Sequence, residues 1–240
     1  MASLTSQTPT TTHLTLHTIW SKLTTTEAAR DLSLHERETA GTGGNITLVY
    51  GELGPTATMH VFAKIQYHSL RTRQKTSPSH STFLDVGSGS GKVLIAAAVL
   101  GCQHPFASII GIELLQSLHE VACTNVQEID HNGRIECVHG DALSSDTLDK
   151  EQWSNIDVVF CNATMFNEKM LLQLSKLPLQ AGTLCCTSSH KLNDSYWELM
   201  DEWVEEKDGN WGNATTLYMF VRRSKRETMI RRMAKQMSSA

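Results

Sequence analysis

Residues 81–102 read STFLDVGSGSGKVLIAAAVLGC, and this stretch decides the fold. Its first part, Phe83–Val86, is apolar apart from one aspartate and predicts a short strand, whereas Lys92–Leu100 predicts a helix. Between them glycine occupies every second position, at Gly87, Gly89 and Gly91. Glycine lets a backbone turn tightly and approach a ligand without a Cβ in the way. The stretch therefore predicts a ligand site where a strand ends and a helix begins.

The rest of the chain repeats this alternation of strand and helix. Further strands are predicted at 108–113, 135–139, 157–162, 182–187 and 215–222, and helices at 115–129, 168–177 and 195–205. Such alternation is typical of a parallel sheet with helices on both faces, and right-handed crossovers make the sheet doubly wound. The last strand follows only a short turn, so an antiparallel edge position is open to it. The predicted fold class is α/β, with a doubly wound, mostly parallel sheet.

Helical segments precede the sheet. Residues 17–38 predict one or two helices with Ser33 as a cap between them, and the segment after Pro55 has the apolar spacing of a further helix. The first dozen residues are rich in threonine and serine, so we expect them to be disordered. We divide the chain into an N-terminal helical extension (1–80), an α/β core (81–223) and a basic C-terminal tail (224–240).

Composition excludes several classes of protein. With 240 residues, 40% of them hydrophobic and 19% charged, the chain resembles an ordinary globular protein. It has no apolar run of transmembrane length and no secretion signal, so we expect an intracellular location and no membrane contact. The six cysteines form no C-x-x-C pair and no zinc-ligand spacing with histidine, so no metal site is expected.

Charge is unevenly distributed along the chain. Segment 222–237 carries seven basic residues and one acidic residue, a net +6, so the rest carries −10 within an overall charge of −4. A basic tail on an acidic body predicts contact with nucleic acid or with an acidic protein, here through Arg222–Lys235. A solvated terminal helix is the alternative.

The glycine loop alone is compatible with several kinds of site. A dinucleotide site of the form G-x-G-x-x-G would have its third glycine where Lys92 stands, which weakens a nicotinamide interpretation. A phosphate-binding G-x-x-x-x-G-K-S/T sequence is absent. A tight turn that holds no ligand is the remaining alternative.

Polar residues at the ends of successive strands indicate which ligand the loop holds. A carboxylate after the second strand suits the two hydroxyls of a ribose. An acid beside the loop suits an amine or another cation, and an acid after the third strand suits an exocyclic amino group. Together they describe a nucleoside that carries an amino acid, which is S-adenosylmethionine. The four residues are Asp85, Glu113, Asp141 and Asn162.

On these residues the chain resembles a known family. The segments FLDVGSGSGK, GIE and HGDAL look like the motifs of class I S-adenosylmethionine-dependent methyltransferases. Three further segments, VYGEL, VVFCNATMFN and WGNATTLYMFVRR, narrow the resemblance to the Dot1-like, non-SET histone-lysine methyltransferases. The resemblance covers about Val49–Arg223, and Ala163 stands where the family has a second asparagine. It implies a seven-stranded, Rossmann-like sheet, a histone or nucleosome substrate and a nuclear chromatin regulator.

The resemblance also implies a role for each matching residue. Glu113 would hold the ribose, and Asp141 with Ala142 would meet the adenine. The segment Tyr50–Glu52 would fold over the cofactor, so that the N-terminal extension contributes to the site. The residues implied to bind the cofactor are Tyr50, Gly51, Glu52, Asp85, Gly87, Gly89, Gly91, Lys92, Glu113, Asp141, Ala142 and Asn162. Those implied to be catalytic are Asn162, Phe166 and Tyr50, with Asn162 and Phe166 bordering the substrate channel.

Two other functions stay open from the sequence. One is a methyltransferase that acts on a non-histone protein or a small molecule. The other is a cofactor-binding module without activity that recognises a partner through its tail. Intact Asp85, Glu113 and Asn162 favour catalysis over the second of these.

Overall fold

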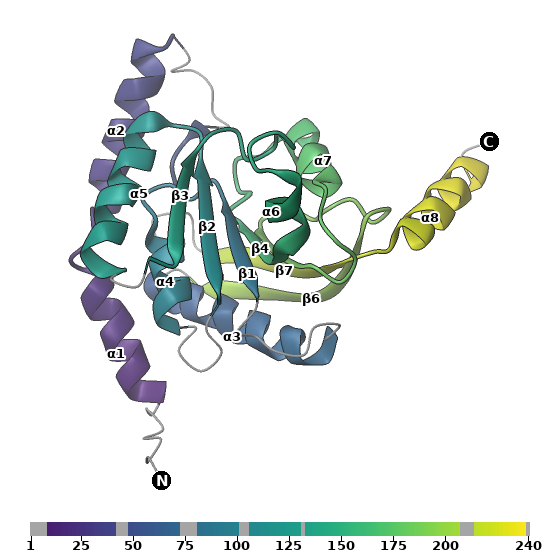
Figure 1. Cartoon of the computed structure of the whole chain (residues 1–240), viewed down its shortest axis with the longest axis horizontal. Helices are drawn as coiled ribbons and strands as arrows, with labels where there is room; N and C mark the ends of the chain where they lie inside the picture. The colour runs from purple at the N-terminus through teal and green to yellow at the C-terminus, as the bar shows by residue number, and fades with distance from the viewer. Residues whose placement is uncertain are drawn as a thin grey trace.

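Seven strands form one sheet in the part of the chain that the structure describes, residues 9–41, 48–72, 81–100, 106–130, 133–206 and 214–238 (Figure 1). This computed structural model places the strands in the order β3-β2-β1-β4-β5-β7-β6. Strands β1 to β5 are parallel, β7 is antiparallel to β5, and β6 is antiparallel to β7. The predicted α/β fold with a mostly parallel sheet is therefore confirmed. The bounds are β1 (Thr82–Val86), β2 (Ser108–Glu113), β3 (Ile135–His139), β4 (Ile156–Cys161), β5 (Leu184–Ser188), β6 (Trp197–Glu206) and β7 (Ala214–Arg222).

Helices cover both faces of the sheet. One face carries α1 (Pro9–Trp20), α3 (Pro55–Thr72), α4 (Lys92–Leu100) and α5 (Gln116–Ile129), and α2 (Thr26–Thr39) packs on α5. The other face carries α6 (Lys150–Asn155) and α7 (Glu168–Lys176). The last helix, α8 (Lys225–Ser238), extends away from the sheet (Figure 1).

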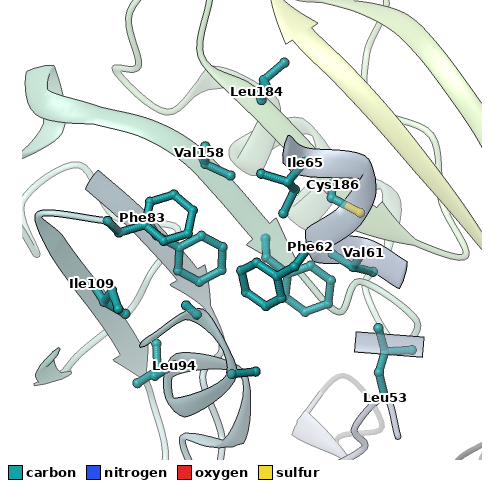
Figure 2. Packing of buried hydrophobic residues seen from close by; sticks show 14 of the residues in the cluster. Leu53, Val61, Phe62, Ile65, Phe83, Leu94, Ile109, Val158, Leu184 and Cys186 are labelled. Atoms are coloured by element: carbon teal, nitrogen blue, oxygen red, sulfur yellow. The ribbon is translucent and has the colours of Figure 1, made fainter. Parts of the chain in front are cut away.

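Successive residues of the central strands enter two separate hydrophobic clusters. Phe83 of β1 faces α3 and α4, whereas its neighbour Leu84 faces α6 and α7. Figure 2 shows the first cluster, where Phe62 of α3 lies beside Phe83 with the ring centroids 5.4 Å apart. All five residues of β1 are buried, as expected for a parallel strand covered on both faces.

Strand β6 replaces a helix that the sequence predicts at 195–205. Its pairing with β7 shifts register between Leu199 and Asp201, and such a bulge turns later side chains to the opposite face. Trp197 accordingly packs in the cluster below α7, and Trp203 packs in the one below α3. The bulge breaks the period-2 pattern and leaves a spacing of apolar residues that imitates a helix. Strand β6 lies at the edge of the sheet, so the predicted edge strand β7 lies one place further in.

The N-terminal part also differs from expectation in detail. Helix α1 begins at Pro9, within the stretch expected to be disordered, and residues 1–8 lie outside the described part. The break between the two helices falls at Ser21–Thr25, and Thr25 caps α2 by accepting a hydrogen bond from the Ala28 amide at 3.2 Å. Ser33 is not a cap but a buried residue within α2. The division of the chain at residues 80 and 223 stays a prediction.

Candidate active site

A pocket opens at the carboxyl ends of β1, β2 and β4. The chain runs from β1 through β2 to β3 at one edge, then returns to β4 on the other side of β1. Ligands of doubly wound sheets bind where the strand order reverses in this way. The residues that line the pocket are Leu48, Val49, Tyr50, Gly51, Val86, Gly87, Gly89, Ile112, Glu113, Leu114, Leu115, Leu118, Asp141, Ala142, Leu143, Asn162, Thr164, Met165, Phe166 and Met170.

The glycine loop shapes the floor of this pocket. Gly87 has a φ of +75°, which side chains rarely tolerate, and a Cβ added to it would meet open space. A ligand can therefore approach its backbone closely. A Cβ on Gly89 would lie 2.4 Å from Cε2 of Tyr50, so this glycine makes room for the tyrosine ring.

Glu113 ends β2 and lies against the glycine loop. Its Oε2 accepts a hydrogen bond from the Gly89 amide at 2.8 Å, and its Oε1 accepts one from the Leu115 amide at 2.9 Å. Burial raises the pKa of this carboxyl group, and the hydrogen bonds from Leu115 and Gly89 oppose the rise. Because each carboxylate oxygen has two lone pairs, Glu113 can still accept hydrogen bonds from two ligand hydroxyls.

Asp85 is the last but one residue of β1 and is 2% exposed. Burial raises its pKa well above the usual range, and the nearby Glu113 carboxylate raises the pKa further. No cation of the described residues contributes to that shift. A cationic ligand would supply the missing compensation, because an opposite charge favours the ionised carboxylate.

Asp141 follows β3 at the exposed side of the pocket. Its Oδ1 accepts a hydrogen bond from the Leu143 amide at 2.8 Å, which fixes the turn that carries Ala142. Ala142 is buried, and Leu114 and Leu143 also line this part of the pocket. An acid at the rim of an apolar slot suits a flat ring with an exocyclic amino group.

The segment Tyr50–Glu52 lies over the glycine loop. The Tyr50 hydroxyl bonds to Ser90 Oγ at 2.9 Å and donates to Glu52. Glu52 in turn accepts a hydrogen bond from Thr26 at the start of α2 and forms an ion pair with Lys92. We call residues 50–52 the cover segment, since these bonds hold it against the start of α4.

Asn162 joins the cover segment to the end of β4. Its Nδ2 donates to the Gly51 carbonyl at 2.9 Å. Its Oδ1 accepts hydrogen bonds from Thr164 at 2.9 Å and from Ser188 at 2.5 Å. Ser189, 3.1 Å from Thr164 between hydroxyl oxygens, has a φ of +63°, the one left-handed value among the described residues other than glycine. Both ends of the Asn162 amide are thus fixed at the rim of the pocket.

The structure gathers most of the predicted site residues into this pocket. Nine of them line it: Tyr50, Gly51, Gly87, Gly89, Glu113, Asp141, Ala142, Asn162 and Phe166. Four predicted residues, Asp85, Gly91, Glu52 and Lys92, do not line it, and Glu52 pairs with Lys92, so their contact with a ligand stays a prediction. The sequence did not point to Ser90, Thr164, Ser188 or Ser189, because isolated hydroxyl residues carry no recognisable spacing.

The donor set of the pocket fits S-adenosylmethionine. The ribose corresponds to Glu113 as a diol acceptor, and the adenine to Asp141 beside an apolar slot. The positively charged end corresponds to the buried carboxyl of Asp85, whose pKa no described cation lowers. None of the described residues forms a cluster of three or more side chains that could ligate a metal ion. No described helix is long and apolar enough to span a membrane.

Comparison with known families adds to this geometry. A family model described as "Histone methylation protein DOT1" matches residues 44–202, about two thirds of the chain. The match confirms the predicted resemblance and, with it, S-adenosylmethionine as the cofactor. Comparison with curated protein sequences gives no match.

Solved structures resemble the chain in fold. A protein from Pyrococcus horikoshii, described as a candidate RNA methyltransferase, has 12% identity and a TM-score of 0.55, over 91% of this chain and 100% of that one. A tRNA methyltransferase from B. subtilis has 14% identity and a TM-score of 0.46, over 61% of this chain and 62% of that one. An RNA methyltransferase from Salinibacter ruber, in complex with S-adenosyl-L-homocysteine, has 19% identity and a TM-score of 0.44, over 61% of this chain and 84% of that one.

Proposed function

The chain belongs to the family of DOT1 histone methylation proteins and is an S-adenosylmethionine-dependent methyltransferase, and we propose that it methylates a lysine of a protein, with a histone as the favoured substrate. The family supports a histone, and the pocket supports the chemistry. A histone substrate would place the protein in the nucleus as a chromatin regulator.

The proposal assigns the cofactor to named residues. Glu113 accepts hydrogen bonds from the ribose hydroxyls, and Asp141 accepts one from the adenine amino group. Ala142 packs against the adenine ring. Gly87 and Gly89 let the methionine part lie close to the backbone, and Asp85 balances its positive charge. Tyr50 and Gly51 close over it from the cover segment. When bound, S-adenosylmethionine would supply an electrophilic methyl group. A neutral lysine amine would attack the methyl carbon in line with the C–S bond, which breaks as S-adenosylhomocysteine leaves.

The side chains at the pocket mouth prepare the lysine. At pH 7 a lysine with its ordinary pKa needs about 4.6 kcal/mol to lose its proton. Met165, Phe166 and Met170 line the mouth and exclude water, so they lower the pKa of an entering ammonium group. None of the lining residues described is a histidine, so the proton leaves to water rather than to a general base.

The position of Asn162 is the observation that carries the proposal. Its amide is held at both ends, by Gly51 on one side and by Thr164 and Ser188 on the other. A fixed polar group in an apolar mouth orients a flexible aliphatic amine, and correct orientation is the main contribution that an enzyme makes to an in-line displacement. In this proposal Asn162, Phe166 and Tyr50 form the catalytic set.

Contact with nucleic acid through Arg222–Lys235 stays part of the proposal in a narrower form. The Arg222 guanidinium stacks near Tyr196 and Trp197 and donates to the Ser175 carbonyl, so it serves the fold. Arg223 pairs with Glu198 at 2.9 Å. Among the exposed cations of α8, we assign Arg226 and Arg231 to contact with the phosphates of nucleosomal DNA.

Labelled methyl transfer tests the proposed substrate class. The full chain is incubated with S-adenosylmethionine carrying a labelled methyl group and, separately, with histone octamers, nucleosomes, total RNA and a protein-free metabolite extract. We expect label on a histone and much less with an Asn162→Ala variant. Label found only on RNA or on small molecules would show that the proposed protein substrate is wrong. Transfer to none of these substrates would contradict the proposed activity.

A further inference from the structure

A second hollow lies far along the chain from the glycine loop, between α8 and the body. It is a groove of about 1190 Å³. One wall comes from α8, including Met229, Arg232 and Met233, and the other comes from α6 and the segment 176–181. Figure 1 shows that α8 extends away from the sheet. None of the pocket residues assigned to the cofactor lines this groove.

The apolar side of α8 in the groove is uncovered. Met229 and Met233 stand one helical turn apart and are 59% and 54% exposed. An ion pair between Lys235 and Asp194 ties the end of this helix to the body. A helix of this length is marginal in water unless an apolar face is packed, and methionine adapts its shape to many partners. The helix is therefore built to be completed by another surface.

The groove is strongly basic, although the rest of the chain is acidic. Six cationic residues and one acid, Asp146, line it. Arg222 and Arg223 are bound to the body, as described above. The other four form no ion pair with a described residue, and they come from both walls: Lys150, Lys176, Lys225 and Arg232. The occupant must therefore carry negative charge together with apolar side chains.

A protein helix meets both requirements better than a nucleic acid does. Phosphates would satisfy the cations but would leave Met229 and Met233 facing a charged backbone. The α8 residues of the groove run from Lys225 to Gln236, a length of about 17 Å at 1.5 Å per residue. The groove also exceeds the range of about 300–1,000 Å³ typical of small-molecule sites. An amphipathic helix laid along such a groove presents its apolar face to the methionines and its acidic face to the lysines.

We propose that this groove binds an acidic, amphipathic helix of a partner protein. Binding of this kind is independent of methyl transfer, so the proposal goes beyond the proposed function and can fail without it.

A defined peptide tests the proposal on the full-length protein. The probe is a fluorescein-labelled peptide of about 15 residues, with leucine at positions i, i+3, i+4 and i+7 and glutamate at most others. A scrambled peptide of the same composition is the matched probe. We expect anisotropy to show at least about tenfold weaker binding of the scrambled peptide, equivalent to about 1.4 kcal/mol, because it cannot place its leucines on one face.

Variants in matched pairs locate the binding surface. The double variant Met229→Ser, Met233→Ser should bind the helical peptide at least about tenfold more weakly. The control Ile230→Ser, Met237→Ser changes exposed positions outside the groove lining, so its affinity should change less than about twofold. On the other wall, Lys150→Glu should weaken binding, and Lys169→Glu on α7 should not. The second pair stays decisive if serine substitutions unwind α8. Unchanged affinity for S-adenosylmethionine shows that each variant is folded.

Four results would overturn the proposal. The scrambled peptide could bind as tightly as the helical one, which would leave only unspecific charge attraction. The groove variants could behave like their matched controls. A DNA duplex could bind with the same dependence on Met229, Met233 and Lys150, which would make the groove a nucleic-acid site. Light scattering could show a dimer that the groove variants dissociate, which would make the groove an interface between two copies of the chain.

Discussion

The Glu52 carboxylate and the Lys92 ammonium form a buried ion pair, with 2.6 Å between Oε1 and Nζ. The two side chains are only 10% and 5% exposed. Lys92 is the first residue of α4, where a positive charge is unfavourable next to the helix N-terminus. Glu52 offsets that charge and at the same time holds the cover segment, and through it Tyr50, above the glycine loop.

Removal of either partner should therefore destabilise the fold strongly. Lys92→Met or Glu52→Gln is expected to lower the free energy of unfolding by about 3–5 kcal/mol, because each leaves a buried group without its partner. The exposed pair Lys191–Glu202 is the matched control, and Lys191→Met should change the free energy of unfolding far less than Lys92→Met, because solvent screens an exposed ion pair. Urea denaturation measures both. If Lys92→Met left stability unchanged but abolished cofactor binding, Lys92 would contact the cofactor directly.

Glu113→Gln should weaken binding of S-adenosylmethionine by about 1–3 kcal/mol, because the buried carboxylate that accepts hydrogen bonds from the ligand hydroxyls is lost. Glu36 provides the control, since its carboxylate also accepts backbone hydrogen bonds at the start of α5, from Gln116 at 2.9 Å and Ser117 at 2.8 Å. Glu36→Gln should lower stability but leave cofactor affinity almost unchanged. Isothermal titration calorimetry decides between them, and equal losses of affinity would show that Glu113 acts only through the loop.

Cofactor binding should release protons at pH values above the ordinary carboxyl pKa of about 4. Burial raises the pKa of Asp85 and of Glu113 in the free protein. The folded chain therefore retains protons that the unfolded chain gives up from about pH 4, so its free energy of unfolding falls as the pH rises above that point. A bound cation favours the ionised carboxylates, and the affinity should rise with pH over the same range.

Calorimetry in two buffers of different ionisation enthalpy measures this proton release. Asp85→Asn should reduce it and flatten the dependence of affinity on pH. Proton uptake on binding, or an unaltered profile in Asp85→Asn, would mean that the positive end of the cofactor lies away from Asp85.

Asn162→Ala should lower turnover by roughly a hundredfold, because a small displacement of the reacting groups costs about that much. Its effect on cofactor affinity should be much smaller. Asn167→Ala is the control, since Asn167 caps α7 by accepting a hydrogen bond from the Met170 amide at 3.0 Å. That change should cost about 1 kcal/mol of stability and spare turnover. Near-normal turnover of Asn162→Ala would show that Asn162 has only a structural role at the end of β4.

The sheet could be predicted from sequence where local pattern and tertiary environment agree. Strands β1, β2 and β4 are largely apolar runs, and each precedes a segment of the right length for a crossover. The helix predicted at 195–205 was wrong, because the bulge of β6 between Leu199 and Asp201 changes the face on which each side chain lies. No local rule signals a bulge, since the partner strand β7 decides where the extra residue fits.

The site divides in the same way. Residues such as Glu113 and Asp141 could be found because a carboxylate directly after a strand must lie at the edge of the sheet where ligands bind. The ion pair of Glu52 with Lys92 joins residues 40 positions apart in different elements. Nothing in the sequence of either element indicates that the other will lie beside it, so the sequence predicts contact of both residues with the cofactor rather than with each other.

The most direct test of the account is the identity of the methylated atom. Histone octamers and nucleosomes are incubated with S-adenosylmethionine and the full chain, then digested and analysed by tandem mass spectrometry. The account predicts methyl groups on the side-chain nitrogen of a histone lysine, present with the native chain and strongly reduced with Asn162→Ala. Methylation of another kind of side chain, or a modified lysine that is equally abundant with Asn162→Ala, would contradict it.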